Sequence, residues 1–290
     1  MTRELLEKIS RSVIGNAGMS RIVTRVGSFA AIIDLYTDRF WYSFAAPIVQ
    51  GRMGADAGRD SRAPATRRGQ DWQDSLSALR AHFSSAERSL RFEFLEVLFP
   101  DLGPELERAG FSLSSRDPLM ILEPGELRPA EAHGVTVTHL DSSASTGLLR
   151  TYLEISRAAF GGQDGPNDAD LRLMGHYVAV GAQLCSLAFI DGVCAGAGCC
   201  LPFQNTAEIA GIGTLPAFRH RGVASTLTSA IVERFFGGGG RLAWLSAGGA
   251  ESGKVYASLG FGYTGCFQLN YEDGCRAQSS ESSTALQGDQ

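Results

Sequence analysis

The segment FRHRGVAS, residues 218–225, combines residue types that suit the binding of an anion. Arg219 and Arg221 supply positive charge, and the spacing R-x-x-G-x-A places the small residues Gly222 and Ala224 where a helix is expected to begin. The first turn of a helix has unpaired backbone N–H groups and a positive dipole end, so an anion can bind there. The segment indicates a metal-free pyrophosphate site, and an ordinary strand-to-helix turn is the alternative.

The elements expected around this segment fit such a site. The stretch TAEIAGIGTL, residues 206–215, reads as a strand. After it, apolar residues fall four apart on one helical stripe, and this stripe consists of Val223, Leu227, Ile231 and Phe235. The glycine run 237–240 ends that helix. A short strand, RLAWLSA, a helix, AESGKVYASLGF, and a final strand pair in GYTGCFQLNY follow.

This ordered set resembles the GNAT superfamily of acetyl-CoA-dependent N-acetyltransferases, over residues 134–273. Its R/Q-x-x-G-x-G/A loop binds the pyrophosphate of coenzyme A, and its Y-x-x-L-G-F helix end matches Tyr256 to Phe261. The resemblance implies that the acetyl-CoA cosubstrate is bound by Ile212, Gly213, Thr214, Leu215, Arg219, His220, Arg221, Gly222, Val223, Ala224 and Ser225. The sequence departs from the family at SAGGAES, residues 246–252, where many members carry an asparagine, and one cofactor contact is thereby weakened.

Tyr256 is the candidate for protonating the leaving thiolate. A phenol has a pKa near ~10, so it stays protonated at neutral pH and can donate. The resemblance places the matching tyrosine beside the coenzyme sulfur. The alternative is a tyrosine packed on the sheet with its hydroxyl in water.

Glu208 is the candidate base, because it is the acid in an otherwise apolar strand and such surroundings raise the pKa of a carboxylate. It lies eleven residues before Arg219, the interval found in histone-acetylating members of the family. The alternatives are a water chain, an amine that binds in its neutral form, and a glutamate at the solvent rim with no role. His139 and His176 are weaker candidates. Gly211 and Gly213 in the same strand predict a bulge, where the Ile212 N–H would face the thioester oxygen.

Composition limits the remaining function classes. The chain has 290 residues, 44% of them hydrophobic, and a net charge of −5, which argues against a general binder of nucleic acid or anionic membranes. The N-terminus lacks the apolar centre of a signal peptide and no apolar run could span a bilayer, so we expect a cytoplasmic protein. The six cysteines lack paired-ligand spacing, so no metal is expected. Cys199 and Cys200 are candidate nucleophiles for a covalent enzyme intermediate, although the sequence places no partner histidine.

The expected fold class is mixed α/β, with a GNAT acyltransferase fold in the C-terminal half and a smaller GNAT-like α/β domain before it. The predicted divisions are an N-terminal domain over 1–130 with a flexible loop at 51–70, the acetyltransferase domain over 134–273, and a disordered tail over 277–290. The helix endings LERAGF and VYASLGF are alike, which suggests a degenerate GNAT-like first half, as in tandem members. That half has no R-x-x-G-x-A loop.

The sequence therefore predicts an N-acetyltransferase that moves acetyl from acetyl-CoA directly to an amine, with a small molecule as acceptor. A coenzyme A-binding scaffold without activity and a transferase of longer acyl chains are the rivals. No nucleic acid or membrane partner is expected, and a homodimer is compatible with the sequence.

Overall fold

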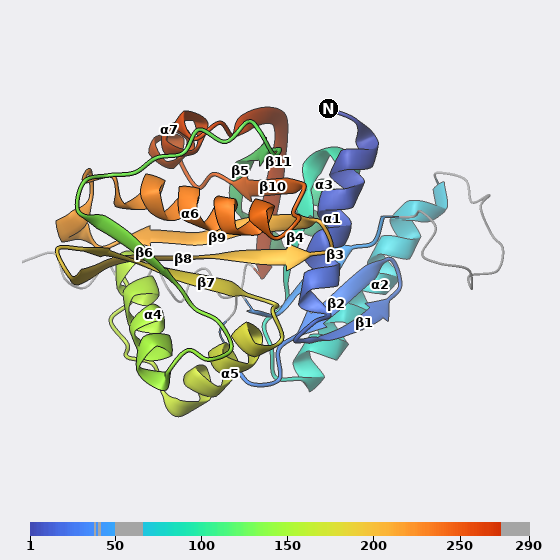
Figure 1. The fold of residues 1–290 in the computed structure, drawn as a ribbon. Coiled ribbons are helices and arrows are strands. Elements are labelled where there is room, and N and C mark those ends of the chain that lie inside the picture. Colours follow the sequence, from blue (N-terminus) through green and yellow to red (C-terminus); the bar gives the residue numbers. More distant parts are fainter. Residues whose placement is uncertain (38, 40–41, 50–65, 274–290) are drawn as a thin grey trace, which may run out of the picture. The chain divides into compact units, whose positions relative to one another are not determined.

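The computed structural model describes residues 1–37, 39, 42–49 and 66–273. These residues divide into two compact units (Figure 1). Unit 1 comprises residues 1–14, 21–116 and the chain from Cys266 onward, and unit 2 comprises residues 15–20 and 117–265. Unit 1 is therefore completed by residues of the last strand, which are remote in sequence from the rest of that unit.

Unit 1 is a mixed sheet with helices, in the strand order β1-β2-β3-β4-β11-β5. The pairs β1–β2, β2–β3 and β4–β11 are antiparallel, and β3 and β4 are parallel. Its elements are α1 (Arg3–Ala17), β1 (Ile22–Val26), β2 (Phe29–Ile33), β3 (Phe44–Pro47), α2 (Thr66–Ser85), β4 (Arg91–Leu95), a 3-10 turn (Glu96–Leu98), α3 (Leu102–Arg108), the first part of β5 (Phe111–Leu122) and the second part of β11 (Gly262–Asp273).

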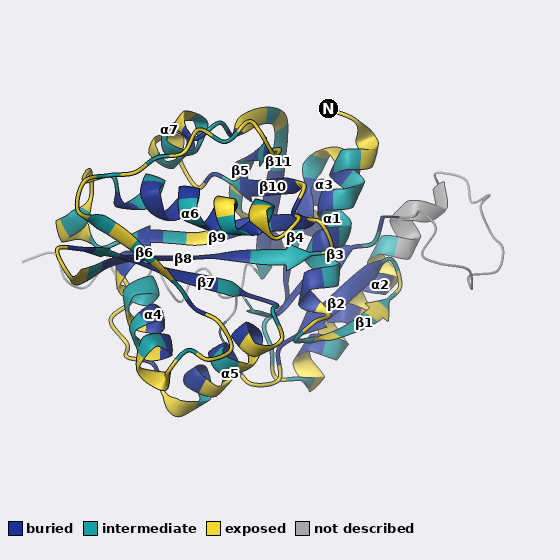
Figure 2. Cartoon of the chain, in the orientation of Figure 1, coloured by how far each residue is buried: buried dark blue, intermediate teal, exposed yellow. Residues whose placement is uncertain are grey.

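The core of unit 1 forms because β2 is apolar on both faces and α2 covers it. All five residues of β2 are buried, which is the pattern of a strand enclosed on both sides (Figure 2). Leu76, Leu79 and Phe83 of α2 belong to the same apolar cluster as Phe29 and Phe92. Aromatic rings meet edge to face within this cluster, which favours their packing.

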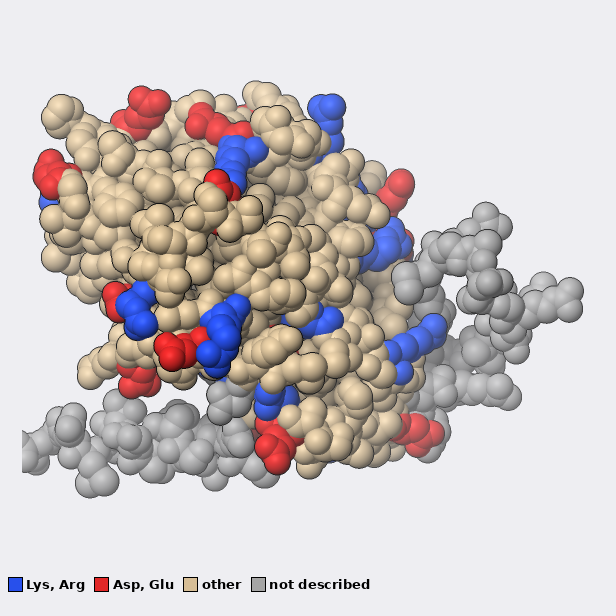
Figure 3. Space-filling model, turned by 60° about the horizontal axis from the view of Figure 1, so that its bottom comes forward, with Lys and Arg blue, Asp and Glu red and all other residues tan. Residues whose placement is uncertain are grey.

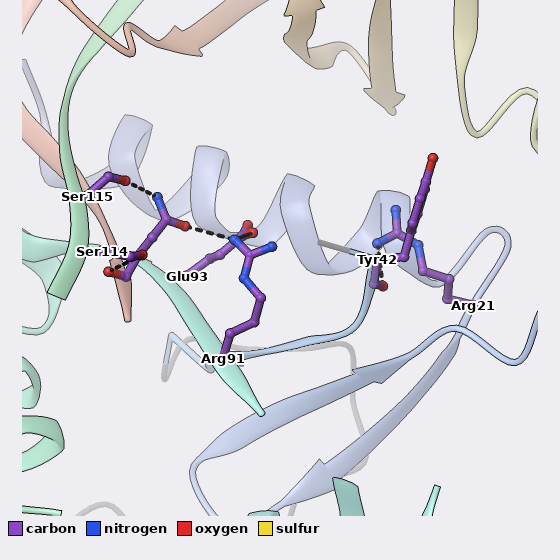
Figure 4. A network of polar contacts seen from close by, with 7 residues as sticks. Arg21, Tyr42, Arg91, Glu93, Ser114 and Ser115 are labelled. Atoms are coloured by element: carbon purple, nitrogen blue, oxygen red, sulfur yellow. Dashed lines mark hydrogen bonds and ion pairs between the residues drawn. The ribbon is translucent and has the colours of Figure 1, made fainter. Parts of the chain in front are cut away.

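A network of polar side chains lies among the strands of unit 1 (Figure 4). Arg91 of β4 is nearly buried and pairs with Glu93. Its guanidinium also donates to Asn270 of β11 at 3.2 Å, and Asn270 donates to Ser115 of β5 at 2.9 Å. A buried charge needs such partners, so this network fixes how β4, β11 and β5 lie side by side.

Unit 2 has the strand order β5-β10-β9-β8-β7-β6. Its strands also pair antiparallel, except the parallel pair β9 and β10. Its elements are the second part of β5, β6 (Val135–His139), α4 (Thr146–Ala159), α5 (Asp168–Ala179), β7 (Leu184–Ile190), β8 (Val193–Phe203), β9 (Thr206–Thr214), a 3-10 turn (Pro216–Phe218), α6 (Val223–Gly237), β10 (Leu242–Ser246), α7 (Ala250–Ser258) and the start of β11.

Helices cover both faces of the strands in unit 2. Figure 1 shows α6 and α7 on one face and α4 and α5 on the other. The α6 face is packed by the predicted stripe of the helix, whose members Val223, Leu227, Ile231 and Phe235 are all buried. The α4 face holds a second apolar cluster that includes Leu149, Leu153 and Met174. This layering confirms the predicted mixed α/β class.

Several local predictions can be compared with the structure. The sequence Asp191-Gly192 is typical of a hairpin turn, and these residues join β7 to β8 with positive φ angles of 52° and 78°. The predicted strand pair in GYTGCFQLNY is wrong, because those residues form the single strand β11, which continues from unit 2 into unit 1. Residues 66–70 were expected in a loop but lie in α2, whereas the rest of that loop and the tail lie outside the described residues.

Candidate functional site

The N-terminus of α6 has the geometry that an anion site requires. Gly222 is the N-cap residue and adopts the left-handed conformation, with φ 78° and ψ 6°. A Cβ atom on Gly222 would lie 2.5 Å from the Cβ of Ala132, so glycine is required for both conformation and space. The first helical hydrogen bond runs from the Thr226 N–H to the Gly222 carbonyl at 3.0 Å. The N–H groups before Thr226 belong to the first turn, where helices lack internal partners.

The arginines of the motif are held by contacts of their own. Arg219 donates from Nε to the Thr214 carbonyl and from Nη2 to the Ala159 carbonyl, both at 3.4 Å. Arg221 pairs with Asp191 at 3.4 Å, and both side chains are exposed. Arg219 thus connects the loop to α4, an arrangement that the spacing of the motif does not reveal. A role for either arginine on phosphate oxygens stays a prediction.

His220 and Ser225 complete the loop. His220 is exposed and has a positive φ of 61°, which is uncommon for a residue other than glycine. The Ser225 hydroxyl donates to the Gly222 carbonyl at 2.9 Å. Two residues with positive φ, His220 and Gly222, therefore turn the chain before α6.

Strand β9 contains the predicted bulge and separates from its parallel neighbour. The pairing of β8 with β9 shifts between Ala197 and Cys199, and β9 has one residue more than β8 there. Gly211 lies in the bulge with φ 61°. The parallel pairing of β9 with β10 ends at Glu208, although β10 continues to Ser246. Within the described residues, the edge of β9 beyond Glu208 is therefore open on the β10 side.

Ile212 and Gly213 face opposite sides of this open edge. A Cβ on Gly198 would lie 2.5 Å from Cδ1 of Ile212, which packs with the cluster under α6. A Cβ on Gly213 would lie 2.6 Å from the Cβ of Ala159 in α4. Leu215 donates its N–H to the Ala195 carbonyl at 2.9 Å, so β8 holds the end of this segment.

Tyr256 lies on α7 and is partly buried against the α6-side cluster. Its ring centroid is 6.0 Å from that of Phe261, in an edge-on arrangement. Burial raises the pKa of Tyr256 to about 12. In the part of the chain that the structure describes, no group hydrogen-bonds to its hydroxyl. The phenol is therefore protonated at neutral pH, as a proton donor must be.

Glu208 is half-buried on the α4 face of the strands. Its neighbours Ala207 and Ile209 both belong to the α6-side cluster, so Glu208 between them points the other way. Trp244 of β10 pairs in register with Glu208, and the same alternation puts its indole on the same face. The indole is buried, and its Nε1 has no partner within the described residues. The sequence reasoning missed Trp244, because nothing in RLAWLSA indicates its register.

The cysteines and histidines fit the chemistry less well. Cys199 and Cys200 are buried, and burial raises the pKa of Cys199 to about 12 and that of Cys200 further. Such thiols do not ionise at neutral pH, which disfavours a thiolate nucleophile. Burial, with a smaller effect of Arg234, lowers the pKa of His139 on the edge strand β6, where its Nδ1 contacts the Ser186 hydroxyl at 2.8 Å. His176 is exposed on α5. Neither histidine is on β9, β10 or α7.

Among the described residues, charged and metal-binding groups form no second candidate site. On the face drawn in Figure 3, acidic and basic side chains of the described residues are interspersed. No cluster of three or more histidine, cysteine or acidic residues that could hold a metal occurs among the described residues. None of the helices in the described ranges is long and apolar enough to cross a bilayer.

Residues 149–261 match the model of the Acetyltransferase (GNAT) family, and this segment contains the open strand, the α6 N-terminus and Tyr256. This segment is therefore similar to GNAT acetyltransferases, and the similarity points to acyl transfer from acetyl-CoA as the reaction class. No curated protein matches the sequence.

Solved structures share the fold over most of the chain. A GCN5-related N-acetyltransferase from Kribbella flavida has a TM-score of 0.70 at 23% identity, covering 93% of this chain and 95% of that one. A tandem GNAT protein from the clavulanic acid biosynthesis pathway has a TM-score of 0.55 at 16% identity, covering 85% and 78%. A GCN5-related N-acetyltransferase from Sphaerobacter thermophilus has a TM-score of 0.56 at 15% identity, covering 85% and 76%. The expected resemblance to GNAT proteins, including a tandem one, is confirmed.

Proposed function

We propose that the protein is an N-acetyltransferase that moves the acetyl group of acetyl-CoA directly to an amine of a small molecule. The observation that carries the proposal is the open edge of β9, which begins at its bulge and leads into the glycine-capped N-terminus of α6. An open strand edge can pair with an extended amide-containing chain, and the helix N-terminus suits a pyrophosphate.

Two backbone segments bind different parts of the coenzyme. In this proposal the backbone N–H groups of Gly222 to Ser225 hold the pyrophosphate of the coenzyme. The backbone of Gly213 to Leu215 pairs with the pantetheine arm. The loop fits the group, because Gly222, where a Cβ would collide with Ala132, lets the chain turn into the N-terminus of α6. When bound, acetyl-CoA supplies an activated thioester.

Three groups of the protein take part in the acetyl transfer: the Ile212 N–H, Tyr256 and Glu208. The Ile212 N–H at the bulge stabilises negative charge on the carbonyl oxygen. The amine nitrogen forms a bond to the acetyl carbon, the carbon–sulfur bond breaks, and the Tyr256 hydroxyl protonates the departing sulfur. Glu208, directly or through water, accepts the proton that the amine releases. The raised pKa values of Cys199 and Cys200 favour this direct route over an acyl-cysteine intermediate.

The test begins with calorimetric titration of acetyl-CoA into the full-length protein. A panel of small amines is then screened for release of free coenzyme thiol. Binding together with thiol release on at least one amine supports the proposal. Binding without release on any small amine contradicts it and favours a coenzyme-binding scaffold or a macromolecular acceptor. Absence of binding contradicts the coenzyme site itself.

The role of Glu208 needs a separate measurement. With a responsive amine, Glu208→Gln should lower kcat/KM for the amine by roughly 100-fold and leave coenzyme binding unchanged, as expected for loss of a general base. Glu233→Gln is a matched control, since Glu233 is an exposed glutamate on α6. Equal kcat/KM values for the two variants would mean that water, and not Glu208, accepts the proton released by the amine.

A further inference from the structure

Phe160 is the C-cap residue of α4, and it exposes a large apolar ring beside the open edge of β9. Its exposed fraction is 67%, although most phenylalanines of unit 2 are buried or partly buried. The ring atom Cε2 lies 3.1 Å, and Cζ 3.6 Å, from the position that a Cβ on Gly213 would take. The ring therefore rests against the backbone of β9 at a residue without a side chain.

The backbone beneath this ring is firmly fixed. Arg157, three residues before Phe160, pairs with Asp170 of α5 at 2.8 Å, and both side chains are nearly buried. Asp170 and Asn167 form a capping box at the start of α5. Arg219 donates to the carbonyl of Ala159, the residue before Phe160. The exposed ring is therefore carried by a fixed backbone next to β9 and not by a loose loop.

The geometry around β9 indicates which part of a ligand would meet the ring. Ile212 lies on the α6 side of the strand, and the Phe160 ring lies on the α4 side at Gly213. A chain paired with the open edge at Gly213 to Leu215 would pass next to the ring. The N-terminus of α6 lies beyond the 3-10 turn Pro216–Phe218, further along the chain.

We propose that Phe160 covers the pantetheine arm of the coenzyme next to Gly213, an inference that rests on the proposed function. Covering removes the exposed ring from water and shields the acyl end of the arm from water. Phe160 is thus a specificity residue for the arm, whereas the nucleotide end is held by the α6 loop. Arg219 is a positioning residue that keeps the end of α4 against β9.

The test compares two probes by calorimetry: coenzyme A, and adenosine 3′,5′-bisphosphate, which lacks the pantetheine arm. Phe160→Ala should weaken coenzyme A binding roughly 10-fold, as expected for losing most of the burial of one aromatic ring. Binding of the bisphosphate should not change. Phe160→Leu should restore part of the affinity. Because Phe160 is exposed, these variants should fold, and thermal melting checks this.

Val180→Ala is the matched control. Val180 is also the C-cap residue of its helix, α5, and is also an exposed apolar residue, at 39%. It should leave both affinities unchanged. Unchanged coenzyme A binding in Phe160→Ala, or equal weakening of both probes, overturns the inference while the proposed function stands. Failure of the unaltered protein to bind coenzyme A overturns both.

Discussion

The two units share one arrangement of elements, and unit 2 contains the proposed coenzyme site. In unit 1, antiparallel strands lead to β3, the helix α2 and the parallel strand β4. In unit 2, antiparallel strands lead to β9, the helix α6 and the parallel strand β10. A short helix follows in each, α3 or α7. Both short helices are followed by a positive-φ glycine and a buried phenylalanine, Gly110–Phe111 and Gly260–Phe261.

The units differ in what surrounds the parallel pair. Unit 2 has the bulge at Gly211 and the left-handed Gly222 before α6. Unit 1 has the polar network of Arg91, Glu93 and Asn270 among its strands (Figure 4). The segment before α2 lies largely outside the described residues, and its sequence lacks R-x-x-G-x-A. The shared order of strands and helices is therefore explained by core packing. A ligand site depends in addition on a few backbone positions that packing does not require.

Gly222→Val, which removes a feature of the loop in unit 2, should have the largest effect, and this effect is on coenzyme A binding. Valine at φ 78° is strongly disfavoured, and its Cβ would overlap Ala132, so the loop must move. We expect coenzyme A to bind roughly 1000-fold more weakly, equivalent to about 4 kcal/mol. Gly237→Ala, at the open far end of α6, is the control and should bind normally. Normal binding by Gly222→Val would remove the main difference between the units.

Tyr256→Phe should lower kcat roughly 100-fold without weakening coenzyme binding, since it removes only the proton donor. Unit 1 offers a matched tyrosine. Burial and the nearby Glu107 raise the pKa of Tyr271 to about 12, and its hydroxyl contacts Glu107 at 3.1 Å. Tyr271→Phe should leave kcat unchanged and cost about 1 kcal/mol of stability. Stopped-flow turnover and urea unfolding separate the two effects, and similar kcat losses would contradict the assignment.

The pH profile sharpens the same assignment. A phenol that donates a proton loses its function as the pH rises through its pKa. Because burial raises the pKa of Tyr256 from its ordinary value of 10.0 to about 12, its donation should persist through pH 10. We expect the Tyr256-dependent ratio of kcat values, unaltered protein over Tyr256→Phe, to stay constant from pH 7 to pH 10. A ratio that falls towards 1 below pH 10 would indicate an ordinary, solvated tyrosine.

The two glycines that follow the short helices should differ in the free energy of unfolding. A Cβ on Gly110 would meet no atom within 4 Å, so Gly110→Ala should cost only the left-handed strain, about 1 kcal/mol. A Cβ on Gly260 would overlap the carbonyl oxygen of Glu126. Gly260→Ala should therefore cost roughly 3 kcal/mol, measured by urea unfolding. Equal costs would mean that the Glu126 segment moves freely.

The smallest expected difference is between one ion pair of each unit, measured as the free energy of unfolding. Arg91–Glu93 in unit 1 has side-chain exposures of 10% and 18%, whereas Arg221–Asp191 in unit 2 has 46% and 76%. Glu93→Gln should cost roughly 2 kcal/mol, because it removes the opposing charge from a nearly buried guanidinium. Asp191→Asn should change stability by less than about 0.5 kcal/mol. A cost for Asp191→Asn equal to that of Glu93→Gln would contradict this ranking.

The sequence by itself determined the elements that depend on local patterns. The four-residue stripe from Val223 predicts α6, Asp191-Gly192 predicts the hairpin turn, and Gly211 and Gly213 predict the bulge, because each feature reflects a backbone or periodicity requirement of nearby residues. The helix α5 and the strand β1 were not predicted, since α5 is held by Asp170 pairing with Arg157 and β1 is a half-exposed edge strand.

Only the tertiary structure decided which remote residues meet. Strands that are remote in sequence become neighbours, because β5 pairs with β10 and β11 pairs with β4. Arg219 turns to the carbonyl of Ala159, Trp244 stands beside Glu208, and the Phe160 ring rests on Gly213. No sequence spacing encodes these contacts. They arise from strand register and from the space that glycines leave, which exist only once the sheet has formed.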